Sequence, residues 1–264
     1  MISKPDRRLA ACLVLAAGLV PAAGLAATAV QAGQREDFLT GRTHECQRCD
    51  LAGMNFKRRD LSGADLTGAN LKQANFHDAK LVGAQLTGAD LTGANLNKAD
   101  LSRAELTGAT LRDAMLYAAN LDGAKLAGAD LSDARMGVSR LSHGDLTKAN
   151  LRNVDLRKAR LPEAIVTGAN LDRAALDFAF MRGAQLGGAS LREARLMGIE
   201  AIDASLTGAD LSEADATGAN FRAADLSHAL LAGTSLRRAN LYETRLDEAV
   251  FRDTVMPDGK IRSR

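Results

Sequence analysis

The segment HECQRCD, residues 44–50, holds the residue types in this chain that are best suited to chemistry. Cys46 and Cys49 are three residues apart, and a tight turn brings the Cα atoms of such residues within about 7 Å, which overlaps the disulfide range. Because the chain also carries export features, described below, and disulfides persist outside the cytoplasm, we predict a structural disulfide between Cys46 and Cys49.

Three other kinds of chemistry are alternatives for this segment. A redox-active pair normally lies between a strand and a helix, and that context is not evident here. Covalent haem attachment requires histidine directly after the second cysteine, where this chain has Asp50. A zinc site of His44, Cys46 and Cys49 lacks an evident fourth ligand. The disulfide is therefore the favoured interpretation, and we expect no cofactor and no metal.

The rest of the chain suggests no catalytic group. His77, His143 and His228 are far apart in the sequence, and glycines do not form a phosphate-binding loop. Aspartates such as Asp65 and Asp90 are frequent, but their regular spacing assigns them to a repeat and not to acid–base catalysis. We predict that the protein is not an enzyme.

A five-residue repeat organises the chain and must position these residues. Counting every fifth residue from Leu51 to Phe251 gives 41 frame positions, of which 32 are Leu, with Phe, Met, Val and Ala at the others. Two residues before each frame position, 32 of 41 residues are Ala. A helix needs apolar spacings that average about 3.6 residues and a plain strand needs about 2, so neither explains this period.

The repeat resembles the pentapeptide-repeat family, whose motif is Ala-(Asp/Asn)-Leu-x-x. Matching copies include Ala64-Asp65-Leu66 and Ala149-Asn150-Leu151. The resemblance implies an all-β solenoid: a right-handed quadrilateral β-helix of about ten coils, with four pentapeptides per coil. The central Leu and the Ala would point inward. On this frame, Cys46 and Cys49 take inward positions.

One side of the predicted prism is small and poor in charge. Segments of the type LTGA recur there at multiples of 20 residues, at 66–69, 86–89, 106–109, 126–129, 166–169, 186–189 and 206–209. We call it the Thr-Gly side. Glycine at the third residue of a corner permits positive φ, so we expect type II turns on this side and more of other types elsewhere. A homodimer packed through this side is one candidate assembly.

A few core positions depart from the repeat. Ala201 replaces a central Leu while Ile199 replaces the nearby Ala, a swap that roughly conserves volume. Ala216 has no such compensation, so we expect a void or an inward-moving neighbour beside it. Phe56 and Phe76 are one predicted coil apart and should stack.

Both ends of the solenoid need caps, because the end coils have no further neighbour. Residues 33–43, GQREDFLTGRT, are predicted to form a short capping helix. Residues 256–261, MPDGKI, are predicted to form a closing turn.

The N-terminus has the layout of a secretory signal peptide. Lys4, Arg7 and Arg8 precede an uncharged stretch rich in Ala, Leu and Val, residues 9–30, which ends in small residues. Cleavage is expected after Ala29 or Ala32, which would give a periplasmic or secreted protein. The alternative is an uncleaved anchor in the inner membrane, because residues 9–30 are long enough to span a bilayer.

Four segments follow from these features. We predict a signal peptide at 1–32, an N-terminal cap with the Cys pair at 33–50, the β-helix at 51–255 and a C-terminal cap or tail at 256–264.

The mature chain is predicted to be neutral. Three of the 34 Lys and Arg residues and one of the 32 Asp and Glu residues lie within residues 1–32, which leaves 31 of each. A neutral protein is neither a general nucleic-acid binder nor a strongly acidic mimic of nucleic acid.

One side of the prism is nevertheless basic. This basic side follows frame positions 56, 76, 96 and onward, and its outward acids are Asp78, Asp155, Asp177 and Asp215. Its outward cations are Lys57, Arg58, Lys98, Arg135, Arg157, Lys158, Arg195, Arg237 and Arg238. Such a side suits an anionic partner, for example a lipid surface or polysaccharide, whereas a mixed solvated face without a ligand is the simpler interpretation.

The sequence favours a non-enzymatic structural or protein-interaction scaffold in the periplasm or extracellular space. The resemblance raises one alternative, because some pentapeptide-repeat proteins mimic duplex DNA, bind DNA gyrase and protect it from quinolones. That mimicry requires a strongly negative rod in the cytoplasm, and this chain is neutral and carries export features. A binding module anchored in the membrane by residues 9–30 is the other alternative.

Overall fold

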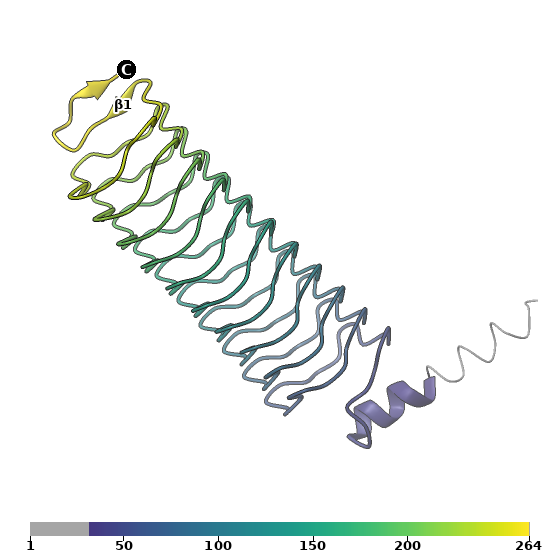
Figure 1. Ribbon diagram of the computed structural model, residues 1–264. Coiled ribbons are helices and arrows are strands. Elements are labelled where there is room, and N and C mark those ends of the chain that lie inside the picture. Colours follow the sequence, from purple (N-terminus) through teal and green to yellow (C-terminus); the bar gives the residue numbers. More distant parts are fainter. Residues whose placement is uncertain (1–31, 264) are drawn as a thin grey trace, which may run out of the picture.

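The computed structural model describes residues 32–263. These residues form a rod of stacked coils, with a short helix at one end and a two-stranded hairpin at the other (Figure 1). The predicted signal peptide or anchor and its first cleavage site lie outside the described residues, and only Ala32 of that segment is described.

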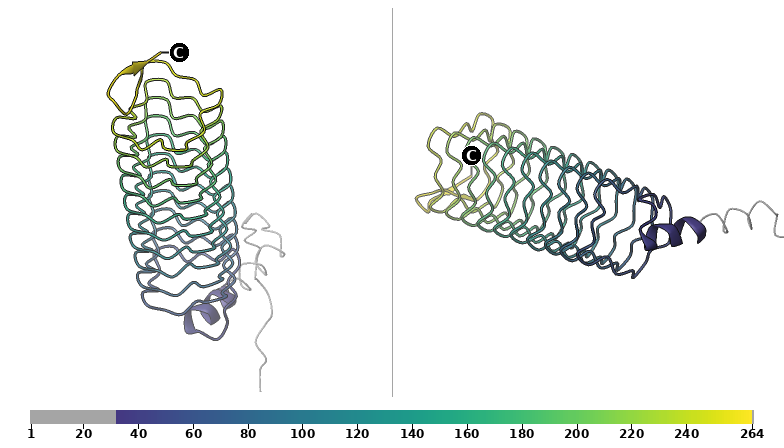
Figure 2. Two further views of the ribbon diagram at one scale, coloured as in Figure 1. Left: turned by 60° about the vertical axis from the view of Figure 1, so that its left-hand side comes forward. Right: turned by 90° about the horizontal axis from the view of Figure 1, so that it is seen from below.

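Each coil contains 20 residues. Parallel bridges pair the residue before each frame position with the residue 20 positions later, from Glu45↔Asp65 to Ser235↔Val255. The bonds run in both directions: the Leu51 N–H donates to the Asn70 carbonyl at 2.8 Å, and the Asn70 N–H donates to the Cys49 carbonyl at 2.9 Å. Figure 2 shows the resulting coils stacked in register along one axis. The register is the one that four pentapeptides per coil require.

The core is narrow and consists mainly of Leu and Ala. Side chains at the frame positions and two residues before them are buried along most of the rod, which confirms the predicted inward frame. Ile199 and Ala201 are both buried, as the proposed exchange of volume requires. Ala216 is fully buried as well, and the void expected beside it stays a prediction.

Every corner from residue 48 to residue 253 has positive φ at its third residue. Glycine occupies 16 of these positions, and 26 belong to other residues, such as Val138 with φ 61° and Lys158 with φ 58°. The expectation of other turn types away from the Thr-Gly side is therefore wrong. The physical reason is the ladder itself, because the third residue of nearly every corner donates its N–H to the next coil, as Arg58 does to His77 at 2.9 Å.

The N-terminal end is closed by a helix at residues 32–40. Phe38 of this helix is fully buried and meets Phe56 edge-on, with ring centroids 5.9 Å apart. Phe56 in turn stacks on Phe76 at 5.0 Å, as predicted. Arg59 occupies an inward position normally taken by Ala, donates to the Leu39 carbonyl at 3.1 Å, and lies over the Phe38 ring. The predicted capping helix is confirmed.

The C-terminal end carries an antiparallel hairpin of β1 (Thr254–Val255) and β2 (Ile261–Arg262). The Met256 N–H donates to the Lys260 carbonyl at 2.8 Å, which closes the turn, and Gly259 has φ +84° within it. The predicted closing turn is confirmed. Within residues 32–263, no helix is long and apolar enough to cross a membrane.

Candidate functional site

The cysteine pair lies in the first coil, next to the capping helix. The structure joins Cys46 and Cys49 by a disulfide, with Cα atoms 5.3 Å apart. Both side chains are buried, whereas His44 is exposed. Within the described part of the chain, no three His, Cys, Asp or Glu side chains are arranged to hold a metal ion. The geometry fits a staple of the first coil, and its oxidation in the native protein stays a prediction.

The recurrent Asp and Asn residues before the frame positions serve the backbone. Asp60 accepts hydrogen bonds from the Ser62 hydroxyl at 2.7 Å and from the Ser62 N–H at 3.1 Å, and these bonds lower the pKa of the Asp60 carboxyl. Burial alone would raise the pKa of Asp90, but hydrogen bonds from Thr92 outweigh it and the pKa is lowered. These carboxylates stabilise corners.

The described histidines do not form a cluster. His143 Nδ1 lies 3.4 Å from Glu163, and His228 Nδ1 lies 3.2 Å from Glu248, each pair joining neighbouring coils on a different side of the rod. His77 belongs to the basic side. The structure therefore brings none of the candidate histidines together.

The basic side carries its charges as predicted, with one exception. Arg157 binds Asp155 through two hydrogen bonds of 2.8 and 2.7 Å, which hold the pKa of the Asp155 carboxyl low. Arg58 pairs with Asp78 at 3.3 Å. Asp177, expected to face outward, is only 4% exposed and lies beneath the chain's surface, where Arg195 Nη2 approaches its Oδ2 at 2.7 Å.

An apolar strip on the basic side was missed by the sequence reasoning. We define it as Tyr117, Val138, Phe178 and Met197, whose exposed fractions are 53, 41, 59 and 41%. All four lie at the second or third residue of corners on one side, in coils separated by the 20-residue register. The signal was present, because writing the sequence in rows of 20 residues aligns these outward apolar residues among arginines and lysines.

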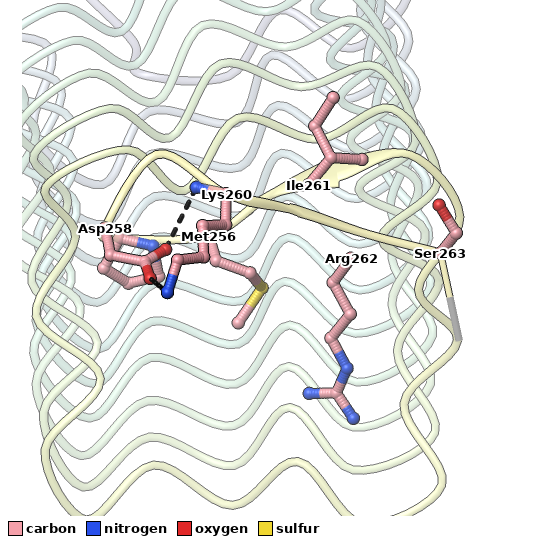
Figure 3. Close-up of a pocket in the computed structure, with 7 residues that line it drawn as sticks. Met256, Asp258, Lys260, Ile261, Arg262 and Ser263 are labelled. Carbon is pink, nitrogen blue, oxygen red and sulfur yellow. Dashed lines mark hydrogen bonds and ion pairs between the residues drawn. The ribbon is translucent and has the colours of Figure 1, made fainter.

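A second surface feature is an open hollow of about 750 Å³ at the C-terminal hairpin. Its lining residues are Met256, Pro257, Asp258, Lys260, Ile261, Arg262 and Ser263. Figure 3 shows Ile261 and Arg262 pointing to opposite faces of the hairpin, and Lys260 reaching Asp258; that ion pair is 3.3 Å long. The Arg262 guanidinium lies 3.7 Å from the centre of the Phe251 ring. These polar groups serve the hairpin and converge on no common point.

Comparison with known proteins agrees with the repeat. The family model described as Pentapeptide repeats (8 copies) matches overlapping segments from residue 45 to residue 253, interrupted only at Ala216. No curated protein matches the chain. The chain belongs to the pentapeptide-repeat family, and its fold class is the right-handed β-helix.

Solved structures of the same family are similar to this chain. HetL, involved in heterocyst differentiation regulation in the cyanobacterium Nostoc sp. strain PCC 7120, is 31% identical; the match covers 87% of this chain and 98% of HetL, with a TM-score of 0.47. Trypsin-treated QnrB1, a plasmid-mediated fluoroquinolone resistance protein, is 19% identical over 75% of this chain and 89% of QnrB1, with a TM-score of 0.46.

Proposed function

We propose that this protein is a non-enzymatic scaffold that binds another protein in the periplasm or outside the cell. The apolar strip is the observation that carries this proposal, because four large apolar side chains are exposed on one side of a rod whose other apolar residues are mostly buried. A rigid rod with flat sides presents such side chains at fixed spacing, which suits recognition of a partner.

The location rests on the sequence of the N-terminus and on the cysteine pair. A basic segment followed by an uncharged stretch and small residues is typical of an export signal. A disulfide between Cys46 and Cys49 fits an oxidising compartment. The DNA-mimic alternative has less support, because the chain without the predicted signal peptide would be neutral and one side of the rod is basic.

The scaffold proposal is tested by placing a photocross-linking amino acid on each side of the rod in native cells. Suitable exposed corner positions are Asp113, Phe178, Arg103 and Thr107, one for each side. An adduct with another protein from at least one position supports the scaffold. An adduct of two copies from position 107 would identify the homodimer through the Thr-Gly side. No adduct from any of the four positions would contradict the proposal.

The location is tested by the intact mass of the protein from separated cell compartments, with and without reduction. A periplasmic or secreted form that starts at Val30 or Gly33, and is lighter by two hydrogens before reduction, is the expected result. A membrane-bound form that retains residues 9–30 would favour the anchor. A full-length, reduced, cytosolic form would contradict export and make an assay of gyrase supercoiling the next experiment.

A further inference from the structure

The two aromatic rings of the apolar strip lie on glycines of the following coil. The Tyr117 ring packs over Gly137, where an added Cβ would lie 3.6 Å from Cδ2 of the ring. The Phe178 ring packs still closer over Gly198, where an added Cβ would lie only 2.8 Å from Cε1. Each ring therefore lies against the backbone of the following coil, while much of its surface stays exposed.

A hollow beside Tyr117 continues the strip toward the cations. It has a volume of about 310 Å³ and is lined by Tyr117, Gly137, Val138, Asp155, Arg157 and Lys158. The hollow thus combines a ring, an aliphatic side chain, the ion pair of Arg157 with Asp155, and one further cation, Lys158. This combination fits a group with an apolar body and a negative charge.

Around the strip, the carboxylates have cationic partners, but two of the cations have no carboxylate partner within the described part of the chain. Asp155 is bound by Arg157, and Asp177 is approached by Arg195, so both carboxylates are neutralised by neighbours. Arg135 and Lys158 have no carboxylate partner among residues 32–263 in this structure. The strip consequently has one cation within it, because Lys158 lies in the same column between Val138 and Phe178, and a second cation, Arg135, at the position before the frame residue of the Val138 coil.

The dimensions of the strip match an extended chain. Stacked coils are about 4.8 Å apart, so the four coil steps from Tyr117 to Met197 span about 19 Å. An extended peptide rises about 3.3 Å per residue, so about six residues cover this length. Because alternate side chains of such a peptide point the same way, apolar residues can contact the strip while acidic residues reach Arg135 and Lys158.

We propose that the apolar strip is the docking site for an extended, acidic and apolar peptide segment of a partner protein. This inference rests on the proposed scaffold function and specifies its site and ligand. A second copy docked face to face through this side would bring Arg135 and Lys158 close to the same cations of its partner, and that repulsion disfavours self-association here. Val138 and Met197 add aliphatic surface, and apolar side chains of a peptide bury such surface more effectively than a sugar chain does.

The test selects random peptides displayed on phage against the full chain and then measures binding of the enriched peptides by fluorescence anisotropy. We expect sequences that combine Asp or Glu with Leu, Ile or Phe, and binding that weakens with salt. Lys158→Glu, and Tyr117→Ser combined with Phe178→Ser, should each weaken binding by at least about tenfold.

Matched variants control for general effects of charge and of aromatic loss. Lys148→Glu changes a lysine at the same corner position, with φ 56°, on the Thr-Gly side. Tyr242→Ser removes a tyrosine that is 65% exposed on another side. Both should bind the selected peptides as the wild type does, and circular dichroism should show that all four variants are folded.

Several results would overturn the inference. The first is selection of peptides without acidic residues. The second is equal binding of the peptides to the strip variants and to the wild type. The third is a loss of binding in the control variants as large as the loss in the strip variants. Binding of polygalacturonate or of phosphatidylglycerol vesicles, without binding of any peptide, would make the ligand a polysaccharide or a lipid surface and would also overturn the inference. In the cross-linking experiment, adducts from positions 103, 107 or 113 but not 178 would refute this site while the scaffold function stands.

Discussion

At the residue scale, the rod depends on a backbone conformation that most of its residues disfavour. Positive φ occurs at the third residue of all 42 corners between residues 48 and 253, and 26 of these residues are not glycine. For an L-residue this conformation costs about 1–2 kcal/mol. It is imposed by the hydrogen bonds between coils, since a corner of any other shape would misplace the N–H that meets the next coil.

The cost of these corners predicts opposite effects of two substitutions. Ala223 has φ 56°, and Ala223→Gly should stabilise the protein by about 1 kcal/mol because glycine adopts this conformation without strain. Gly208 has φ +66° with open space around an added Cβ, so Gly208→Ala should destabilise it by a similar amount through conformation alone. Melting temperatures of both variants would check this. A shift of the same sign for both would contradict it.

The corner carboxylates predict how stability depends on pH. Hydrogen bonds to Asp60 lower its pKa, and the pKa values of Asp90 and Asp130 are lowered although burial opposes the shift. A carboxyl whose folded pKa lies below its unfolded value stabilises the fold above the unfolded pKa, and loses this contribution as pH falls through the folded pKa. The rod should therefore lose stability below about pH 4.

The triple variant Asp60→Asn, Asp90→Asn and Asp130→Asn tests this directly. Asn accepts the same corner hydrogen bonds without titrating, so the variant should lose less melting temperature than the wild type between pH 6 and pH 3. Asp113→Asn is the control, because this exposed carboxylate accepts no hydrogen bond from the described residues. Equal losses in the wild type and the triple variant would show that the corners are not responsible.

At the scale of elements, the capping helix protects the first coils through one side chain. Phe38 is fully buried against Phe56, and Arg59 holds the C-terminal carbonyls of the helix. Phe38→Ala should leave a cavity at the end of the core. Because stability in a solenoid is a sum over neighbouring coils, the damage should stay near that end.

Hydrogen exchange measures this local effect. In Phe38→Ala, the amides of Leu51 and Phe56 should exchange at least about tenfold faster, while the amide of Leu151 should be unchanged. Leu39→Ala removes a half-buried side chain from the same helix and should have a smaller effect. If amide exchange became faster by the same factor along the whole rod, the coils would open together. That result would contradict the description of stability as a sum over neighbouring coils.

The ends illustrate what sequence could predict about elements. The closing turn followed from Pro257, Asp258 and Gly259, which specify their own backbone conformation. The role of Arg59 could not be predicted, because an arginine at an inward position is explained only by the helix that packs over it. The residues of the turn were therefore enough to predict the turn, whereas the role of Arg59 depends on a tertiary contact with the helix.

At the scale of the whole molecule, the 20-residue register predicts which deletions are tolerated. Removing residues 141–160 deletes one full coil, so every later residue keeps its side of the rod and its partner column. This variant should fold with an unchanged circular dichroism spectrum and a modest loss of stability. Removing residues 141–158 instead shifts the inward frame, exposes Leu and Ala, and should prevent folding of the later coils.

The sequence predicted the interior of the molecule far better than its surface. A frame unbroken from Leu51 to Phe251 defines the core, because only one arrangement turns the frame Leu residues and the Ala residues two positions before them inward together. The strip of Tyr117 and Phe178 could be recognised only once outward residues had been assigned to coils. The burial of Asp177 could not be predicted, because it depends on where the long side chain of Arg195 lies.

The direction of the backbone hydrogen bonds also determines how the rod responds to force. They run from coil to coil, as between Leu51 and Asn70, and the helix and hairpin lie at opposite ends of the rod (Figure 1). A pull on these two ends puts every coil under the same tension, and the end coils, which have a neighbouring coil on one side only, should detach first. Every detached coil would release about 65 Å of slack chain. Stretched between two attachment points, the protein would lengthen in steps of equal size. Each step would lower the tension on the two attachment points.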